Sequence, residues 1–200
     1  MNEQKIKQRR GRPSTFNRQE TLTRAMNCYW KDGVYEVSIN ELCKRIKISK
    51  PTLYREYKSE DGLLHDVLKH YQHHVLAPII ESVSQHSSLT DKINSLLTFI
   101  TTPKECHSGC LLVQLTLIPE RLGPKTLSLV HIMQQHTLEL YQSWIVEAQK
   151  NGEAKQAFDS YFLAQYIDAQ ITSLVIRMNL KEDPLMLRRQ GQLSLSVLYT

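Results

Sequence analysis

One short stretch of the chain concentrates side chains that can donate hydrogen bonds or carry positive charge. It contains Lys50, Thr52, Tyr54, Arg55 and Lys58. Cations and donors at this density suit phosphate oxygens and the acceptor-rich edges of DNA bases. The chemistry predicted here is therefore binding of a polyanion. The same residues would also suit the solvated basic face of an ordinary helical hairpin.

A second set of cations lies at the amino terminus, in an arm with almost no apolar residues. It contains Arg9, Arg10 and Arg12, and the run Arg10-Gly11-Arg12-Pro13 resembles the core of an AT-hook. Arginines suit narrow A·T-rich minor grooves, where negative potential is concentrated. We expect residues 1–14 to be a flexible arm that either enters a minor groove or remains a solvated basic tail.

Thiol chemistry is the third candidate. Gly109-Cys110-Leu111 is preceded by Cys106 and His107. We expect Cys110 near a helix amino terminus, where the dipole would lower the thiol pKa, with Cys106 as a resolving thiol. The alternative is that Cys110 is a small packed residue. A His107–Cys110 hydrolase would lack a third orienting group and an oxyanion motif, so we expect no enzyme.

Metal binding is not expected, and neither is any cofactor. His70, His73 and His74 cluster, and His70 with His74 has the spacing of a metal pair on a helix. Asp66 is the sole carboxylate nearby, and no H-E-x-x-H arrangement is present, so solvated or ligand-facing histidines are the better interpretation. The sequence also has no glycine-rich phosphate loop and no strand pattern.

Two short helices joined by a tight turn must position the donors of the first stretch. Ser38 and Glu41 form a capping box, which predicts a helix from Ile39. Ser49 can cap the next helix, and Pro51 suits its first turn. Leu53 is expected to point inward, and Tyr57 either inward or with the donors. With a first helix over residues 16–33, this pattern predicts a helix-turn-helix over residues 38–57.

The segment Leu53 to Leu64 resembles the signature of the tetracycline-repressor (TetR) family. It reads L-Y-R-E-Y-K-S-E-D-G-L-L, and upstream residues including Ala25, Tyr29, Gly33, Ser38, Leu42 and Ser49 also fit. Three departures are Lys47 for a turn glycine, Tyr57 for phenylalanine, and Glu60 for a lysine that commonly contacts phosphate. The resemblance implies double-stranded DNA contacts from these positions: Ser38, Lys50, Pro51, Thr52, Tyr54, Tyr57, Lys58 and the arginines of the arm.

The rest of the chain is predicted to be helical. The helices expected are 89–101, about 125–150, about 157–179 and one from Asp183-Pro184 onward, and another from Ser59 is kinked or ended by Pro78. Small residues Ala164, Ala169 and Ser173 suit either a two-fold helical interface or an intramolecular core. Apolar positions offered as pocket-lining are Leu97, Leu115, Met133 and Trp144.

Composition is consistent with a globular protein that binds a polyanion through its first part. Residues 1–60 hold 14 lysines and arginines against 7 acidic residues, and the remainder holds 11 against 13. This asymmetry indicates a basic reader on a mildly acidic body. No window is apolar enough to span a membrane, so we expect a cytoplasmic protein. Four cysteines in 200 residues do not make a disulfide scaffold.

The sequence thus predicts an all-α fold of about nine helices. Residues 15–62 would form the DNA-binding domain, called the reader below, and residues 63–200 a ligand-binding and dimerisation domain, called the body. From the resemblance we expect a homodimeric transcriptional repressor that a small-molecule effector releases from a palindromic operator. The alternative is a redox or electrophile sensor using Cys110, with Cys106, on the same fold.

Overall fold

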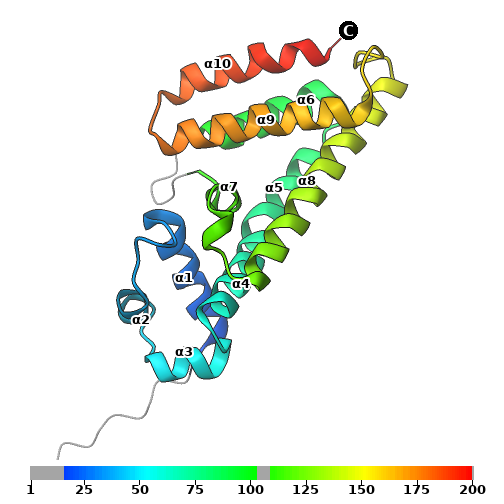
Figure 1. Ribbon diagram of the computed structural model, residues 1–200. Coiled ribbons are helices and arrows are strands. Elements are labelled where there is room, and N and C mark those ends of the chain that lie inside the picture. The colour runs from blue at the N-terminus through cyan, green and yellow to red at the C-terminus, as the bar shows by residue number, and fades with distance from the viewer. Residues whose placement is uncertain (1–15, 103–108, 200) are drawn as a thin grey trace, which may run out of the picture.

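The computed structural model describes residues 16–102 and 109–199, and within these residues the regular structure is helical (Figure 1). The α-helices are α1 (Arg18–Asp32), α2 (Ile39–Ile46), α3 (Lys50–Tyr57), α4 (Glu60–Tyr71), α5 (Ala77–Ser84), α6 (Leu89–Thr101), α7 (Leu111–Thr116), α8 (Pro124–Lys150), α9 (Ser160–Asn179) and α10 (Pro184–Leu195). A π-helical turn, η1 (Gln72–Leu76), joins α4 to α5, and counting these three as one rod leaves nine helices in the described ranges. The predicted all-α fold is confirmed.

The helices of the reader begin where nearby side chains cap their first turns. The hydroxyl of Ser38 accepts a hydrogen bond from the Glu41 backbone N–H at 3.3 Å, and Ser49 accepts one from Thr52 at 3.3 Å. Pro51 occupies the first turn of α3, where its missing N–H costs no helical hydrogen bond. Lys47 ends α2 in the left-handed region with φ of 60°, at the position where the resembled pattern has glycine.

Close backbone packing fixes the angle between α3 and α4. Ser59 caps α4 by accepting from the Gly62 N–H at 2.9 Å. A Cβ at Gly62 would lie 2.0 Å from the carbonyl oxygen of Tyr57, so only glycine permits this approach. The recognition-helix candidate is thereby held rigidly on the rod that leads to the body.

The rod continues beyond the position where Pro78 was expected to kink or end it. The π-helical turn lies just before Pro78, which takes the first turn of α5, and helix persists to Ser84. Such turns interrupt the regular i→i−4 hydrogen bonding and are frequent at bends. Pro78 therefore begins a helical segment instead of ending one.

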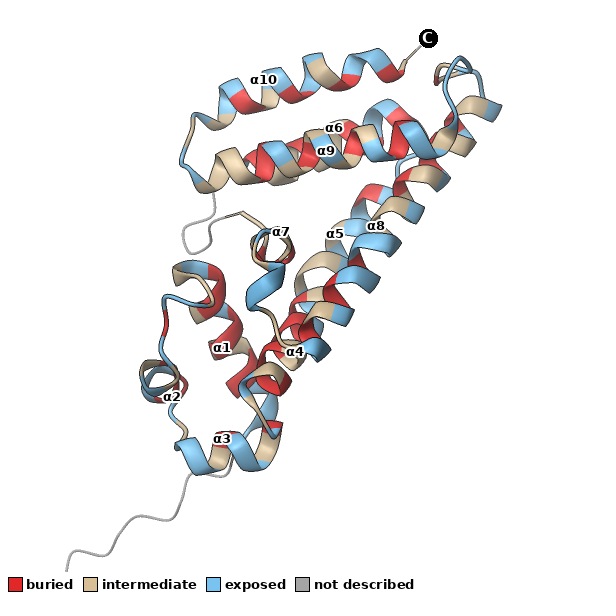
Figure 2. Cartoon of the chain, viewed as in Figure 1, coloured by how far each residue is buried: buried red, intermediate tan, exposed pale blue. Residues whose placement is uncertain are grey.

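Two buried clusters divide the interior, and α8 crosses both (Figure 2). The first unites the reader helices with α4, α7 and the first half of α8; the second unites α6, α9 and α10 with the second half of α8. Side chains of the reader and of the body are thus buried against each other. In the described part of the chain no helix is both long and apolar enough to cross a bilayer.

Candidate nucleic-acid interface

The exposed face of α3 forms one end of the molecule, furthest from α10 (Figure 1). Lys50, Pro51 and Tyr54 are exposed and Thr52 is half-buried, whereas Leu53 is completely buried against the reader core. Lys58, just past the helix, is exposed, as is Ser38 at the start of α2. The structure therefore leaves most of the predicted contact residues accessible, at the start of α2, on α3 and just past its end.

Tyr57 requires a correction, because its side chain faces the core and is only 3% exposed. The ring packs edge-on against Phe16, with centroids 6.3 Å apart, and the Arg18 guanidinium lies over it at 4.8 Å. Burial raises the pKa of the Tyr57 phenol to about 12. Tyr57 therefore packs α3 against the reader core and does not present its side chain on the outer face of the helix.

Hydrogen bonds hold the outer side chains of α3. The Tyr54 hydroxyl donates to Glu60 Oε1 at 2.9 Å, and this bond is the main reason that the pKa of Tyr54 is raised. Lys58 Nζ donates to the Arg55 carbonyl at 2.9 Å. Glu60, which stands where the resembled family commonly has lysine, thus orients Tyr54 while placing a negative charge beside the surface.

Asp61 connects the reader to the body. Its Oδ1 accepts from the Thr126 N–H at 3.0 Å and the Thr126 hydroxyl at 2.7 Å, and its Oδ2 accepts from the Lys125 N–H at 3.0 Å. Burial opposes ionisation, but these bonds from Thr126 and Lys125 outweigh it and lower the pKa of Asp61. A carboxylate at the start of α4 therefore caps the start of α8.

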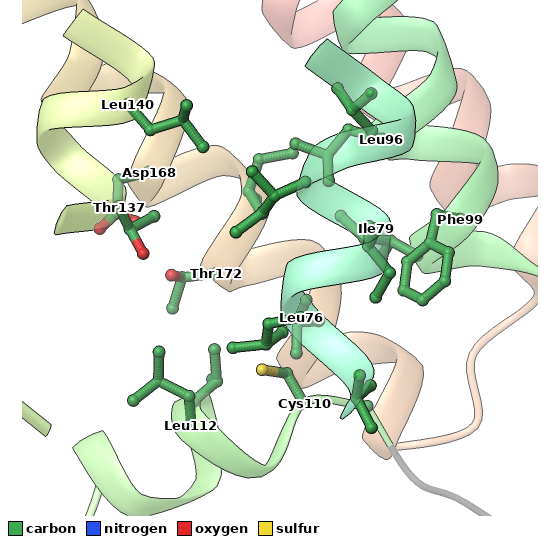
Figure 3. A pocket seen from close by; sticks show the side chains of 18 of the residues that line it. Leu76, Ile79, Leu96, Phe99, Cys110, Leu112, Thr137, Leu140, Asp168 and Thr172 are labelled. Atoms are coloured by element: carbon green, nitrogen blue, oxygen red, sulfur yellow. The ribbon is translucent and has the colours of Figure 1, made fainter. Parts of the chain in front are cut away.

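A cavity of about 220 Å³ lies behind the reader, between α4–α5, α6, α7, α8 and α9 (Figure 3). Of the four residues predicted to line a pocket, Trp144 does so. Leu97, Leu115 and Met133 are instead packed in the two buried clusters. Trp30, at the end of α1, also lines the cavity, and its indole N–H donates to the Gly109 carbonyl at 2.9 Å. The reader thus contributes directly to the cavity wall.

Cys110 immediately precedes α7, as predicted, and it also lies on the cavity wall, but the prediction of a lowered thiol pKa is wrong. Its Sγ accepts a hydrogen bond from the Tyr71 hydroxyl at 3.3 Å. Burial raises the pKa of the thiol, and this effect exceeds the opposing hydrogen bonds from Tyr71 and from the backbone of α7. Cys106 and His107 lie outside the described residues, as do Arg9, Arg10 and Arg12.

The histidines near η1 contact α1. His70 lies 2.9 Å from the Thr23 hydroxyl, His74 lies 3.0 Å from the Gln19 amide, and the His70 and His74 rings are 4.2 Å apart. Residues 16–102 and 109–199 contain no group of three or more His, Cys, Asp or Glu side chains able to hold a metal ion. In the described structure these histidines serve to pack the rod against α1.

Comparison with known proteins places these features in context. The family model described as bacterial regulatory proteins, tetR family, matches residues 22–67. A curated relative, the HTH-type transcriptional repressor ComR of Escherichia coli (strain K12), is 30% identical over 179 residues, covering 86% of this chain and 83% of that protein.

Two solved structures are similar in fold. One is the TetR family transcriptional regulator CifR, a cysteine mutant complexed with 26-bp double-strand operator DNA, at 21% identity and a TM-score of 0.80, covering 94% of this chain and 100% of that one. The other is the reduced form of E. coli NemR, at 16% identity and a TM-score of 0.79, covering 92% and 97%.

Proposed function

The chain belongs to the TetR family of bacterial regulatory proteins, and from this premise we propose that it is a homodimeric repressor released from a palindromic operator by a small molecule. The observation that carries the proposal is α3, which buries Leu53 and Tyr57 and turns Lys50 and Tyr54 outward. A short helix that packs against the core on its inner side and carries cations on its outer side can enter a major groove.

We assign a DNA contact to each predicted residue according to its position on α2, on α3 or just past α3. Lys50, Thr52 and Tyr54 face outward on α3 and are assigned to base and phosphate contacts, with Pro51 packing beside them. Ser38 is the N-cap of α2, where free backbone N–H groups favour a phosphate. Lys58 is assigned to the DNA backbone. We propose that Arg9, Arg10 and Arg12 extend this contact into the minor groove.

The proposed dimer uses α9 and α10. Of the 13 large apolar side chains exposed in the described ranges, 8 lie between Phe158 and Val197. They are Phe158, Tyr161, Phe162, Leu180, Leu185, Met186, Leu193 and Val197. Ala169 and Ser173 are exposed on α9 and would allow close helix approach, whereas Ala164 is already buried within the chain. This concentration of exposed apolar residues supports the proposed interface, because such surfaces favour burial against a partner.

The effector would act through cavity-lining residues that belong to different parts of the chain. Trp30 belongs to the reader, Tyr71 to the rod and Cys110 to the body, and all three line the same space. A ligand that displaces them changes how α1 and α4 sit against α8, and so changes the distance between the two α3 helices of a dimer. Coupling of about 1–3 kcal/mol would lower operator affinity about 5–150-fold.

Selection of bound fragments from random DNA tests this proposal. We expect an inverted repeat whose half-sites are centred about 34 Å apart, bound by two chains. The proposal would be overturned if the selection enriched no particular sequence, or if a single chain bound to an asymmetric site.

The thiol-sensing alternative retains one favourable observation, which is that Cys110 lines the cavity and can meet any electrophile that enters it. Its raised pKa argues against rapid reaction. Cys110→Ser should leave operator binding unchanged under both hypotheses. Loss of a response to oxidant in that variant would favour the sensor.

A further inference from the structure

The cavity has a single acidic side chain and no basic one among the described residues that line it. The acid is Asp168, on α9. The remaining walls are mainly aliphatic and aromatic, with a few hydroxyl and amide groups. Asp168 lies with Thr137 and Thr172 on one side of the cavity, across from Leu76 and Ile79 (Figure 3). The cavity is thus amphiphilic, with its one formal charge at one side.

Asp168 is half-buried and has no partner in the described structure, unlike two other charges that the fold encloses. Lys92, which is 5% exposed, is paired with Glu147 at 2.7 Å, and Asp61 accepts from Thr126 and Lys125. In the described structure Asp168 makes no hydrogen bond or ion pair, and burial alone raises the pKa of its carboxyl. Partly buried charges are normally compensated, so an unmatched one facing a cavity indicates that a ligand supplies the counter-charge.

The aromatic walls next to Asp168 also favour a cation. Burial, with the charge of Asp168 adding to it, raises the pKa of Tyr141, which places this phenol near the carboxylate. The rings of Tyr141 and Trp144 lie 5.4 Å apart, and both line the cavity. Aromatic faces attract cations through their quadrupoles. The Thr137 hydroxyl donates to the Met133 carbonyl at 2.9 Å, which leaves its oxygen to the cavity as an acceptor.

We propose that the effector is a small organic cation with an apolar or aromatic body, recognised through its charge by Asp168; this names the ligand class of the effector site and rests on the proposed function. An anion would meet Asp168 with no basic group to offset the repulsion. A neutral apolar ligand would desolvate Asp168 further without compensation. A cavity of about 150 Å³ holds benzene, so about 220 Å³ leaves room for one ring and a small cationic group.

The chain offers a direct optical test, because both of its tryptophans, Trp30 and Trp144, line the cavity. Phenyltrimethylammonium and tert-butylbenzene have nearly the same shape and differ in charge. Titrated against wild-type protein by tryptophan fluorescence, the cation should bind about tenfold tighter or more. Equal affinities, or preference for tert-butylbenzene, would overturn the proposal without any variant being made.

Asp168→Asn keeps the side-chain size and removes the charge. It should weaken phenyltrimethylammonium about tenfold or more, whereas tert-butylbenzene should bind as tightly as to wild type or more tightly, because the uncompensated charge is gone. Glu139→Gln, which removes an exposed charge on α8 outside the cavity, should change neither affinity. Unchanged cation affinity in Asp168→Asn would also refute the assignment.

Operator binding by the ligand-free protein is measured separately from these titrations. If the cation binds through Asp168 but no operator is bound, the proposed function fails and the ligand class is retained. If the operator is bound and the cation is not preferred, the ligand class fails alone.

Discussion

Replacing Asp61 by alanine should destabilise the protein more than removing an ordinary helix cap, because this carboxylate accepts three hydrogen bonds at the start of α8. The Lys125 N–H is on the surface and can bind water instead. Thr126 is completely buried, so its N–H would lose its acceptor without replacement, whereas its hydroxyl can still donate to the backbone carbonyl of Asp61, 3.2 Å away. A lost cap costs about 1 kcal/mol and the one unsatisfied buried N–H about 1–2 kcal/mol more, giving about 2–3 kcal/mol.

Urea unfolding followed by far-ultraviolet circular dichroism measures this loss at pH 7. Asp159→Ala is the matched control, because Asp159 caps α9 through one bond, from the Phe162 N–H at 2.9 Å, and should cost about 1 kcal/mol. An Asp61→Ala protein that unfolds at the wild-type midpoint, or no lower than Asp159→Ala, would refute the reasoning.

The stability difference between wild type and a second variant, Asp61→Asn, has a pH dependence of defined sign. Since the folded-state pKa of Asp61 is lowered, its stabilisation is fully present above the unfolded pKa of about 3.9 and disappears as pH falls through the lower folded value. The difference between wild type and Asp61→Asn should therefore be constant between about pH 7 and 5 and shrink below about pH 4. A difference that vanishes already near pH 6 would mean that another group is responsible.

Three further changes test the reader and the interface. Glu60→Lys should raise operator affinity and steepen its salt dependence by about 0.9 in log–log slope, because a phosphate contact replaces a negative charge; a weaker complex would show that the Tyr54–Glu60 bond matters more. Lys47→Gly should stabilise the fold by up to about 1 kcal/mol in urea unfolding, since φ at Lys47 is 60°, and a destabilised variant would contradict this. Leu193→Asp, at a residue 74% exposed on α10, should yield monomers in sedimentation, whereas Leu117→Asp should not.

The features that the sequence predicted well depend on neighbouring residues. Ser38, Ser49 and Ser59 cap their helices within three positions along the chain, so residue type and spacing suffice. Pro51 likewise acts within its own turn. The outward direction of Lys50 and Tyr54 followed from helical periodicity once these caps fixed the start of α3.

The features that it did not predict depend on which helices meet. Asp61 and Thr126 are 65 positions apart, and nothing local indicates that they touch. Leu97 and Leu115 are apolar helical residues like Trp144, and only the packing decides which of them faces the cavity. Dipole arguments alone mispredicted the acidity of Cys110, because its desolvation is set by helices distant in sequence.

The most direct test of the account is fluorescence anisotropy of a labelled, selected operator titrated with Lys50→Ala at fixed salt. If the exposed face of α3 reads DNA, this variant should lose about tenfold or more in affinity, while Lys150→Ala, exposed at the far end of α8, should bind like wild type. Equal weakening by the two substitutions, or wild-type binding by Lys50→Ala, would contradict the central claim.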